Sequence, residues 1–219
     1  MTITLDPVYN RVGDIWFCFV EGLKPGDLYL YRVDGPFEPE KGHRFNKKFY
    51  LFDPRALAFT AGSVFKNMAF GQTCPLEKMP KCVIVDTDDY DWEDDRPLRT
   101  PLQDTIIYET HLKGFTASKT SGVKYSGTYR GLIEKIPYLK SLGITAVELL
   151  PIQEFDEYEN ANVNPRTGER MVNYWGYSTI GFFAPKVNFA VDKEPGGVVK
   201  EFKDMVKALH KAGIELILD

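Results

Sequence analysis

The chain has 219 residues, of which 43% are hydrophobic and 14% aromatic, so it is large enough to bury a sizeable core. Its 27 basic and 31 acidic residues give a net charge of −4 without charged blocks, which excludes the electrostatic footprint of a protein that binds nucleic acid or an anionic membrane. No apolar run approaches the ~20 residues of a membrane-spanning helix, and the first twenty residues lack a secretion signal.

Residues 1–60 have the pattern of a small β domain. Two runs favour strands, 14–20 and 28–33, and the residues between them, 22–27, are typical of a turn. They predict a hairpin or a pair of neighbouring strands. Because two or three strands make a marginal sheet, we expect a partial β-sandwich that needs further strands before Met1.

Residues 61–100 are predicted to be a connector. Lys81–Val85 favours one more strand, and the segment 86–99 places seven acidic residues around Tyr90 and Trp92. This segment has two interpretations, a solvated acidic linker or an irregular segment packed on the following domain. Trp92 favours packing.

Residues 101–219 alternate between strands and helices. Short runs typical of buried strands lie within 105–109, 142–151 and 212–219, and glycines at 143 and 213 fit the left-handed position that ends a helix. One helix is predicted from Thr128 to Leu142 with a bend at Pro137, and a second over 198–212 with an apolar face. Repeated strand, helix, strand units indicate a parallel sheet, here with three strands.

The connection from Pro151 to Gly197 is much longer than usual for such units and is predicted to be functional. It follows a parallel strand, where ligands bind in α/β folds, and it is rich in aromatic residues between 173 and 185. Aromatic rings offer flat apolar faces that suit sugar rings. For Tyr177 we favour a binding role, whereas Phe182 and Phe183 are expected to be core of the loop, and Trp175 has both interpretations.

The remaining chemistry-bearing residues give a negative result. His43 and His210 have no partners at metal-binding spacing, and His111 is expected to be packed or hydrogen-bonded. No phosphate loop, zinc cluster or nucleophilic serine motif occurs, so neither a metal nor a cofactor is expected. The acids at the strand ends are Glu109, Glu148 and Asp219, with Asp219 best placed for a ligand.

The three cysteines, Cys18, Cys74 and Cys82, form no C-x-x-C pair. An odd number in a chain of this size indicates reduced thiols, and we predict a cytoplasmic protein.

Several stretches together resemble the α-amylase superfamily of glycoside hydrolases, and within it the isoamylase-like glycogen debranching enzymes. They are Tyr31–Pro36, Gly42–Asn46, Tyr90–Asp95, Asp104–Thr116, Leu142–Pro151, Asn173–Tyr177 and Ala212–Asp219. They occur in the order of that family over nearly the whole chain.

This resemblance implies a multi-domain β plus α/β protein: a partial carbohydrate-binding β-sandwich over 1–60, the connector 61–100, and the first three strands of a (β/α)₈ TIM barrel over 101–219. It implies hydrolysis of α-1,6 branch linkages of glycogen, limit dextrin or related α-glucans by a retaining mechanism. By the same resemblance, Tyr177 stacks under the sugar at the cleavage subsite and Asp219 opens the first signature region. Trp175 is a candidate residue of the same substrate-binding site. The catalytic carboxylates of the family come from later strands, so no residue here is assigned a catalytic role and the chain alone is expected to be inactive.

Two other readings stay open at this point, a non-catalytic α-glucan-binding protein and the product of a disrupted gene. Neither the oligomeric state nor the preferred branch length can be predicted from these residues.

Overall fold

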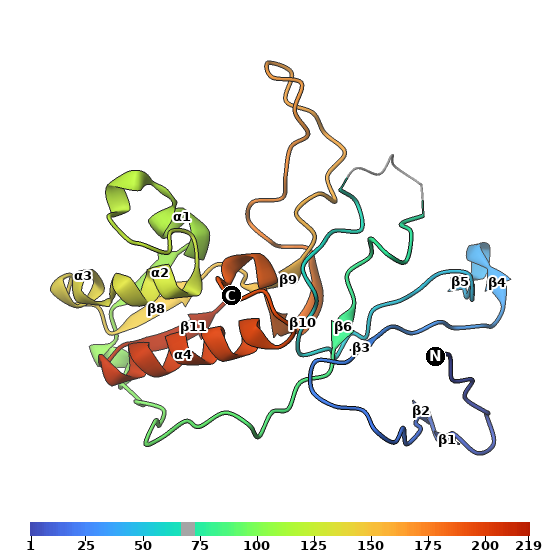
Figure 1. Cartoon of the computed structure of the whole chain (residues 1–219). Helices are drawn as coiled ribbons and strands as arrows, with labels where there is room; N and C mark the ends of the chain where they lie inside the picture. Colours follow the sequence, from blue (N-terminus) through green and yellow to red (C-terminus); the bar gives the residue numbers. More distant parts are fainter. Residues whose placement is uncertain (67–72) are drawn as a thin grey trace.

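A computed structural model of the chain describes residues 1–66 and 73–219 (Figure 1). The parallel sheet of the C-terminal half organises the structure. Its strands are β7 (Ile107–Thr110), β8 (Ala146–Leu149) and β11 (Glu215–Leu218), with β8 in the centre and both pairings parallel. The strands therefore lie side by side in chain order, which is the arrangement of successive strands in a (β/α)₈ barrel. The predicted parallel sheet of three strands is confirmed for these residues.

The helix predicted from Thr128 to Leu142 is two short helices. They are α2 (Tyr129–Glu134) and α3 (Ile136–Ser141), separated at Lys135. The Thr128 hydroxyl accepts a hydrogen bond from the Gly131 amide at 3.2 Å, so Thr128 is the N-cap of α2. Pro137 lies in the first turn of α3, where its missing N–H removes no internal hydrogen bond. The prediction of one bent helix was wrong because proline starts a new helix here.

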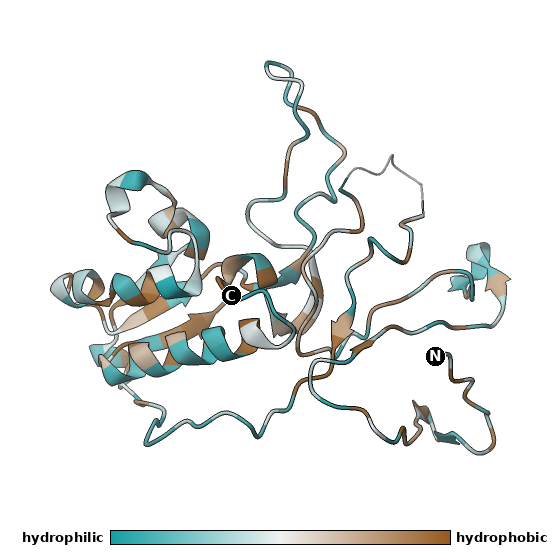
Figure 2. Cartoon of the chain, in the orientation of Figure 1, coloured by the Kyte–Doolittle hydropathy of each residue, from teal (hydrophilic) through white to brown (hydrophobic). Residues whose placement is uncertain are grey.

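The second predicted helix is α4 (Gly197–Lys211), and it packs along one face of the sheet (Figure 1). Apolar and polar residues alternate along it with helical spacing, as the colours of Figure 2 show. Gly143 and Gly213, with φ of +76° and +78°, end α3 and α4 in the left-handed conformation. Each leads directly into a strand of the sheet, as the sequence predicted.

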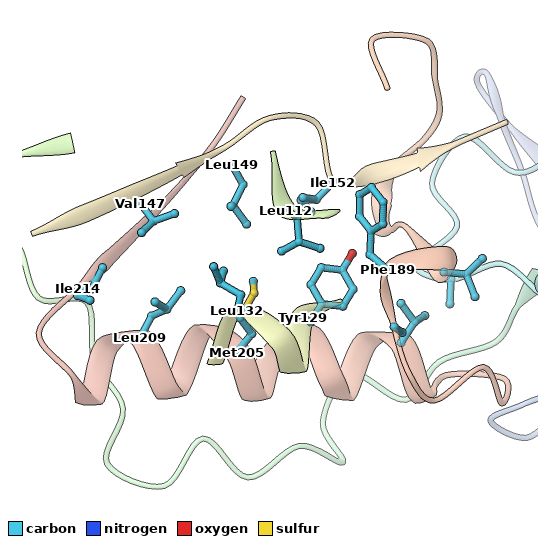
Figure 3. Packing of buried hydrophobic residues seen from close by; sticks show 14 of the residues in the cluster. Leu112, Tyr129, Leu132, Val147, Leu149, Ile152, Phe189, Met205, Leu209 and Ile214 are labelled. Atoms are coloured by element: carbon cyan, nitrogen blue, oxygen red, sulfur yellow. The ribbon is translucent and has the colours of Figure 1, made fainter. Parts of the chain in front are cut away.

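The main hydrophobic core lies between the sheet and these helices (Figure 3). Val147 and Leu149 point from the central strand toward Leu132 of α2 and Leu209 of α4, and all four side chains are fully buried. Tyr129 is also fully buried, and its hydroxyl donates to the carbonyl oxygen of Lys186 at 3.3 Å. One face of the sheet is thus covered by helices, while the other is open.

The long connection between β8 and α4 contains an antiparallel strand pair that the sequence did not predict. β9 (Gln153–Phe155) pairs with β10 (Thr179–Pro185), followed by a short 3₁₀ helix, η4 (Val187–Phe189). The residues between β9 and β10 project away from this stem (Figure 1). At its base Lys186 and Glu154 form a buried ion pair of 2.8 Å, so charge as well as apolar packing fixes the stem.

Short elements precede α2. They are α1 (Leu112–Ala117) and the 3₁₀ helices η2 (Leu102–Asp104) and η3 (Lys119–Ser121). None was predicted, because each is shorter than the window over which helical periodicity can be read.

The strands in the described part of residues 1–100 are each two residues long. They are β1 (Arg11–Val12), β2 (Ile15–Trp16), β3 (Leu28–Tyr29), β4 (Phe37–Glu38), β5 (His43–Arg44) and β6 (Cys82–Val83), with the 3₁₀ helix η1 (Pro39–Lys41). The prediction that the runs 14–20 and 28–33 pair with each other was wrong, because β2 pairs with β1 and β3 pairs with β6. The strand predicted around Cys82 is confirmed. The described part of residues 1–60 contains no pair of stacked sheets, so the β-sandwich stays a prediction.

The acidic segment lies against the outer face of α4. The Tyr90 hydroxyl donates to Asp204 at 2.8 Å, and Asp95 lies 2.9 Å from the ring of His210. Trp92 packs edge-on against the Tyr90 ring with centroids 4.8 Å apart. Of the two interpretations of this segment, packing on the following domain agrees with the structure for residues 90–95. Within the described residues, no helix combines the length and apolarity needed to cross a membrane.

Candidate functional site

The open face of the parallel sheet presents a row of acidic side chains. Residues at equal height in a parallel sheet point to the same side, and Glu109 is in register with Glu148. Their neighbours in sequence, Tyr108 and Val147, pack into the helical core, so the two glutamates face away from it. Asp219 follows β11 one residue beyond Leu218, and its amide donates to the Leu149 carbonyl at 3.2 Å. The three strands thus bring three carboxylates to one side of the sheet.

Tyr177 reaches this face from the long connection. Its hydroxyl donates a short hydrogen bond to Oδ2 of Asp219, although 42 residues separate the two. This hydrogen bond raises the pKa of Tyr177 to about 12, and the charges of Asp219, Glu109 and Glu148 act in the same direction. The hydroxyl therefore stays protonated and donating at neutral pH. Two of the three predicted site residues, Tyr177 and Asp219, are in direct contact.

The third predicted residue, Trp175, lies two positions away and is 57% exposed, while Tyr177 is 59% exposed. Exposed rings of this kind leave their apolar faces open to a sugar. The expectation that Phe182 and Phe183 form core of the loop was wrong: they are 66% and 60% exposed on β10. Buried and exposed side chains do not alternate at these two residues, because the pairing of β10 with β9 shifts its register on both sides of Gly181.

The backbone before Tyr177 is fixed by a set of specific contacts. Gly176 has φ of +86°, and a Cβ there would lie 2.7 Å from the ring of Phe155. The backbone amide of Gly176 donates to Oδ1 of Asn173 at 2.9 Å, and the side-chain nitrogen Nδ2 of Asn173 donates to Oε1 of Glu159 at 2.7 Å. Glycine is required at this position both by backbone conformation and by space. The contacts define the direction in which Tyr177 leaves the loop.

Two anchors hold the long connection to the rest of the molecule. Asp156 is buried and accepts hydrogen bonds from the Ser63 hydroxyl at 2.5 Å and the Val64 amide at 2.6 Å. His111, which follows β7, is buried and hydrogen-bonded on both ring nitrogens, so the expectation of a packed histidine is confirmed. Sequence reasoning did not identify either anchor as part of the site, because the partners are 93 and 63 residues away.

A cavity of about 110 Å³ lies behind the aromatic segment. Its lining residues are Lys113, Phe155, Glu157, Tyr158, Val172, Asn173, Tyr174 and Phe189. Within residues 1–66 and 73–219, no three His, Cys, Asp or Glu side chains are grouped as metal ligands. The arrangement at Tyr177 and Asp219 can stack, hydrogen-bond and orient a neutral polar ligand.

Comparison with known proteins gives a consistent result. The family model described as the α-amylase catalytic domain matches residues 106–219. The chain is 41% identical to the chloroplastic isoamylase 1 of Arabidopsis thaliana, over 99% of this chain and 28% of that protein. It is 42% identical to the glycogen debranching enzyme of Serratia proteamaculans, over 97% of this chain and 33% of that one. The chain thus spans about a third or less of the length of these curated relatives.

Solved structures show the same relationship. The catalytic module of the glycogen-degrading pneumococcal virulence factor SpuA matches with a TM-score of 0.63 and 25% identity, over 89% of this chain and 27% of that chain. A pullulanase from an Anoxybacillus species, complexed with maltotetraose, matches with a TM-score of 0.56 and 29% identity, over 79% and 24% of the two chains. The resemblance found in the sequence is confirmed by both kinds of comparison.

Proposed function

This chain belongs to the α-amylase family of glycoside hydrolases, and from that premise we propose that it supplies substrate-binding residues for the hydrolysis of α-1,6 branch linkages in α-glucans. The observation that carries the proposal is the Tyr177–Asp219 hydrogen bond beside the exposed ring of Trp175. Relatives named as glycogen debranching enzyme and a pullulanase that binds maltotetraose support α-glucan as the ligand. Glycogen and limit dextrin are the substrates that this proposal names.

In the proposed mode of binding, one glucose ring lies on the face of Tyr177. The apolar C–H side of the sugar covers the ring, and the hydroxyl of Tyr177 remains hydrogen-bonded to Asp219. Because Asp219 accepts from Tyr177 on one oxygen, its other oxygen is free to accept from a sugar hydroxyl. Trp175 extends the apolar surface along the chain of the glucan. Neutral sugars need no basic patch, in accord with the net charge of −4.

Further parts of the proposed function concern the reaction mechanism, the domains and the location of the protein. We propose a retaining mechanism, a TIM barrel completed by strands beyond the three described here, and a carbohydrate-binding β-sandwich that includes residues 1–60. Residues 1–219 alone are proposed to bind glucan without hydrolysing it, since the family resemblance assigns the catalytic carboxylates to later strands of the barrel. A cytoplasmic location is proposed on the three free cysteines.

The test is calorimetric titration of the full chain with maltotetraose. Tyr177→Ala should weaken binding about tenfold, equivalent to about 1.4 kcal/mol, because it removes both the stacking face and the hydrogen bond to Asp219. Tyr9→Ala is the matched control, since Tyr9 is 80% exposed and lies far from this site in the sequence. Equal affinities of Tyr177→Ala and wild type would refute the proposed site.

A parallel assay measures the release of reducing ends from glycogen by the same protein. Retention on glycogen without turnover is the expected result and would also fit the non-catalytic reading. Release of reducing ends by residues 1–219 would refute the proposed inactivity, and it would assign catalysis to carboxylates within this chain.

A further inference from the structure

His111 joins the end of β7 to the aromatic segment that carries Tyr177. It is the N-cap of α1, where its Nδ1 accepts a hydrogen bond from the Gly114 amide at 2.9 Å. On the other side of the ring, Nε2 lies 2.8 Å from the carbonyl oxygen of Tyr174. One side chain thus contacts the backbone of two segments that are about 60 residues apart in the sequence.

These two contacts fix the protonation state of the ring. A backbone N–H only donates, so Nδ1 must carry a lone pair toward Gly114. A carbonyl oxygen only accepts, so Nε2 must carry the proton toward Tyr174. The geometry therefore specifies the neutral Nε2–H tautomer of His111. A second proton would turn the accepting nitrogen into a donor that faces another donor.

Ring packing adds to the hydrogen bonds. The His111 ring stacks on the Tyr174 ring with centroids 4.2 Å apart and planes inclined by 18°, and it makes a T-shaped contact with the Phe189 ring at a centroid distance of 5.8 Å. A Cβ at Gly114 would clash with the Tyr174 hydroxyl, so the absence of a side chain there leaves room for the stack. His111, the N-cap of α1, thus contacts both the ring and the carbonyl oxygen of Tyr174.

We propose that His111, as the neutral Nε2–H tautomer, is a positioning residue that orients segment 174–177 so that Tyr177 meets Asp219. This inference rests on the proposed glucan-binding function of that site. His111 touches neither Tyr177 nor Asp219 in the contacts described above; it acts through the carbonyl of Tyr174. Gly176, restrained by Asn173 and Phe155, transmits that orientation to the next residue.

With His111 in this role, the site is expected to be sensitive to acid. Burial lowers the pKa of His111 below its ordinary value of 6.5, and the cation of Lys113 on α1 acts in the same direction. Tyr174 and Phe189 face the ring from the connection and from η4, and the Tyr174 carbonyl favours the proton on Nε2. A lowered pKa means that His111 binds a proton more tightly when segment 174–177 is released from it than when that segment is docked on it. Docking is therefore favoured above pH 6.5 and lost as the pH falls through the lowered pKa.

The first test is NMR of the full chain with ¹⁵N-labelled histidine. At neutral pH the His111 ring should show a protonated Nε2 and an unprotonated Nδ1. His111→Asn keeps an acceptor near Nδ1 for the Gly114 amide but loses the donor to Tyr174, so the amide signals of residues 174–177 and Asp219 should shift. His111→Gln has an amide donor that reaches further and should restore part of those signals. An Nδ1–H tautomer, or unshifted signals in His111→Asn, would overturn the proposal.

The second test is maltotetraose affinity in two backgrounds. His111→Asn should weaken binding about fivefold in the wild-type background, the value of one hydrogen bond. In the Tyr177→Ala background it should change the affinity less than about twofold, because the residue it positions is absent. Equal losses in both backgrounds would assign His111 to general stability and overturn the positioning role. His43→Asn, on exposed β5, is the matched control and should bind as wild type.

The two proposals fail in different ways. If the wild-type chain does not bind maltotetraose, the proposed function is wrong, whereas the tautomer and the amide shifts still decide the role of His111. If the chain binds but His111 is imidazolium at neutral pH, the positioning role is wrong and the proposed function stands.

Discussion

Residues 105–219 and residues 1–60 are similarly rich in apolar side chains but use them differently. In the C-terminal part, Leu132, Leu149 and Leu209 are fully buried between the sheet and its helices. In the N-terminal part, Tyr9 and Phe19 are 80% and 92% exposed, and Figure 2 shows hydrophobic stretches along an extended chain. The difference teaches that apolar content does not itself make a core. A core needs apolar side chains that pack against one another, and Ala58 and Val83 are buried because they join the core of the C-terminal part.

The largest expected effect concerns the ion pair at the base of the long connection. Lys186→Met leaves the Glu154 carboxylate buried without its cation and should lower the free energy of unfolding by about 4 kcal/mol at neutral pH. Urea unfolding of the full chain measures this. Lys200→Met on the exposed face of α4 is the control, with an expected change below about 0.5 kcal/mol.

The pH dependence of that variant has a defined sign. Burial raises the pKa of Glu154, and Lys186 is the main influence that lowers it. Without Lys186 the folded pKa rises further above the ordinary 4.5, so the neutral acid is favoured in the folded state. Relative to wild type, the variant should therefore lose least stability below pH 4.5 and progressively more as the pH rises through the raised pKa of Glu154. A destabilisation by Lys186→Met that is as large at acid pH as at neutral pH would contradict this.

A core truncation sharpens the comparison between the two parts. Leu209→Ala removes a fully buried side chain that packs between α4 and the central strand, and should cost about 3 kcal/mol through lost burial and a residual cavity. The measurement is the urea midpoint with an unchanged slope. A loss below about 1 kcal/mol would mean that the helices are not packed as described.

The packed acidic segment should contribute less. Tyr90→Phe removes the hydroxyl that donates to Asp204 and leaves the ring in place, so the expected loss is about 1 kcal/mol. Thermal unfolding of the two proteins at neutral pH gives the difference. Tyr9→Phe, which alters an exposed tyrosine, should leave the transition unchanged.

The smallest effect is expected in the N-terminal part. Phe19→Ala should change the free energy of unfolding by less than about 0.5 kcal/mol, because the ring is already exposed. This result would extend the comparison to energetics. A loss as large as that of Leu209→Ala would break it, since Phe19 would then have a partner in solution.

Much of the C-terminal part could be predicted from sequence. The helix expected over 198–212 is α4 at 197–211, because an apolar face repeated over four turns is a strong local signal. Gly143 and Gly213 marked helix ends for a local reason as well, the backbone conformation that only glycine adopts easily. Tyr177 and Asp219 were selected by residue type, position and family resemblance, yet nothing local predicts their contact.

What could not be predicted depends on partners that are distant in the sequence. Leu28–Tyr29 pairs with Cys82–Val83 rather than with the run at 14–20, and a strand's own residues do not specify which strand it joins. His111 meets the Tyr174 carbonyl 63 residues away. The exposure of Phe182 and Phe183 follows from a register shift, which alternation within β10 cannot reveal.

The contact between Asp156 and the backbone amide of Val64 makes the joint between the connector 61–100 and the C-terminal part observable. Val64 lies in an irregular segment, where backbone amides normally exchange their hydrogen rapidly with solvent. Here that amide donates to a buried carboxylate 92 residues further along the chain. Its exchange rate therefore reports every opening that breaks this contact. A slow Val64 amide next to a rapidly exchanging segment 1–60 would show that residues 63–64 open together with the unit that contains the parallel sheet.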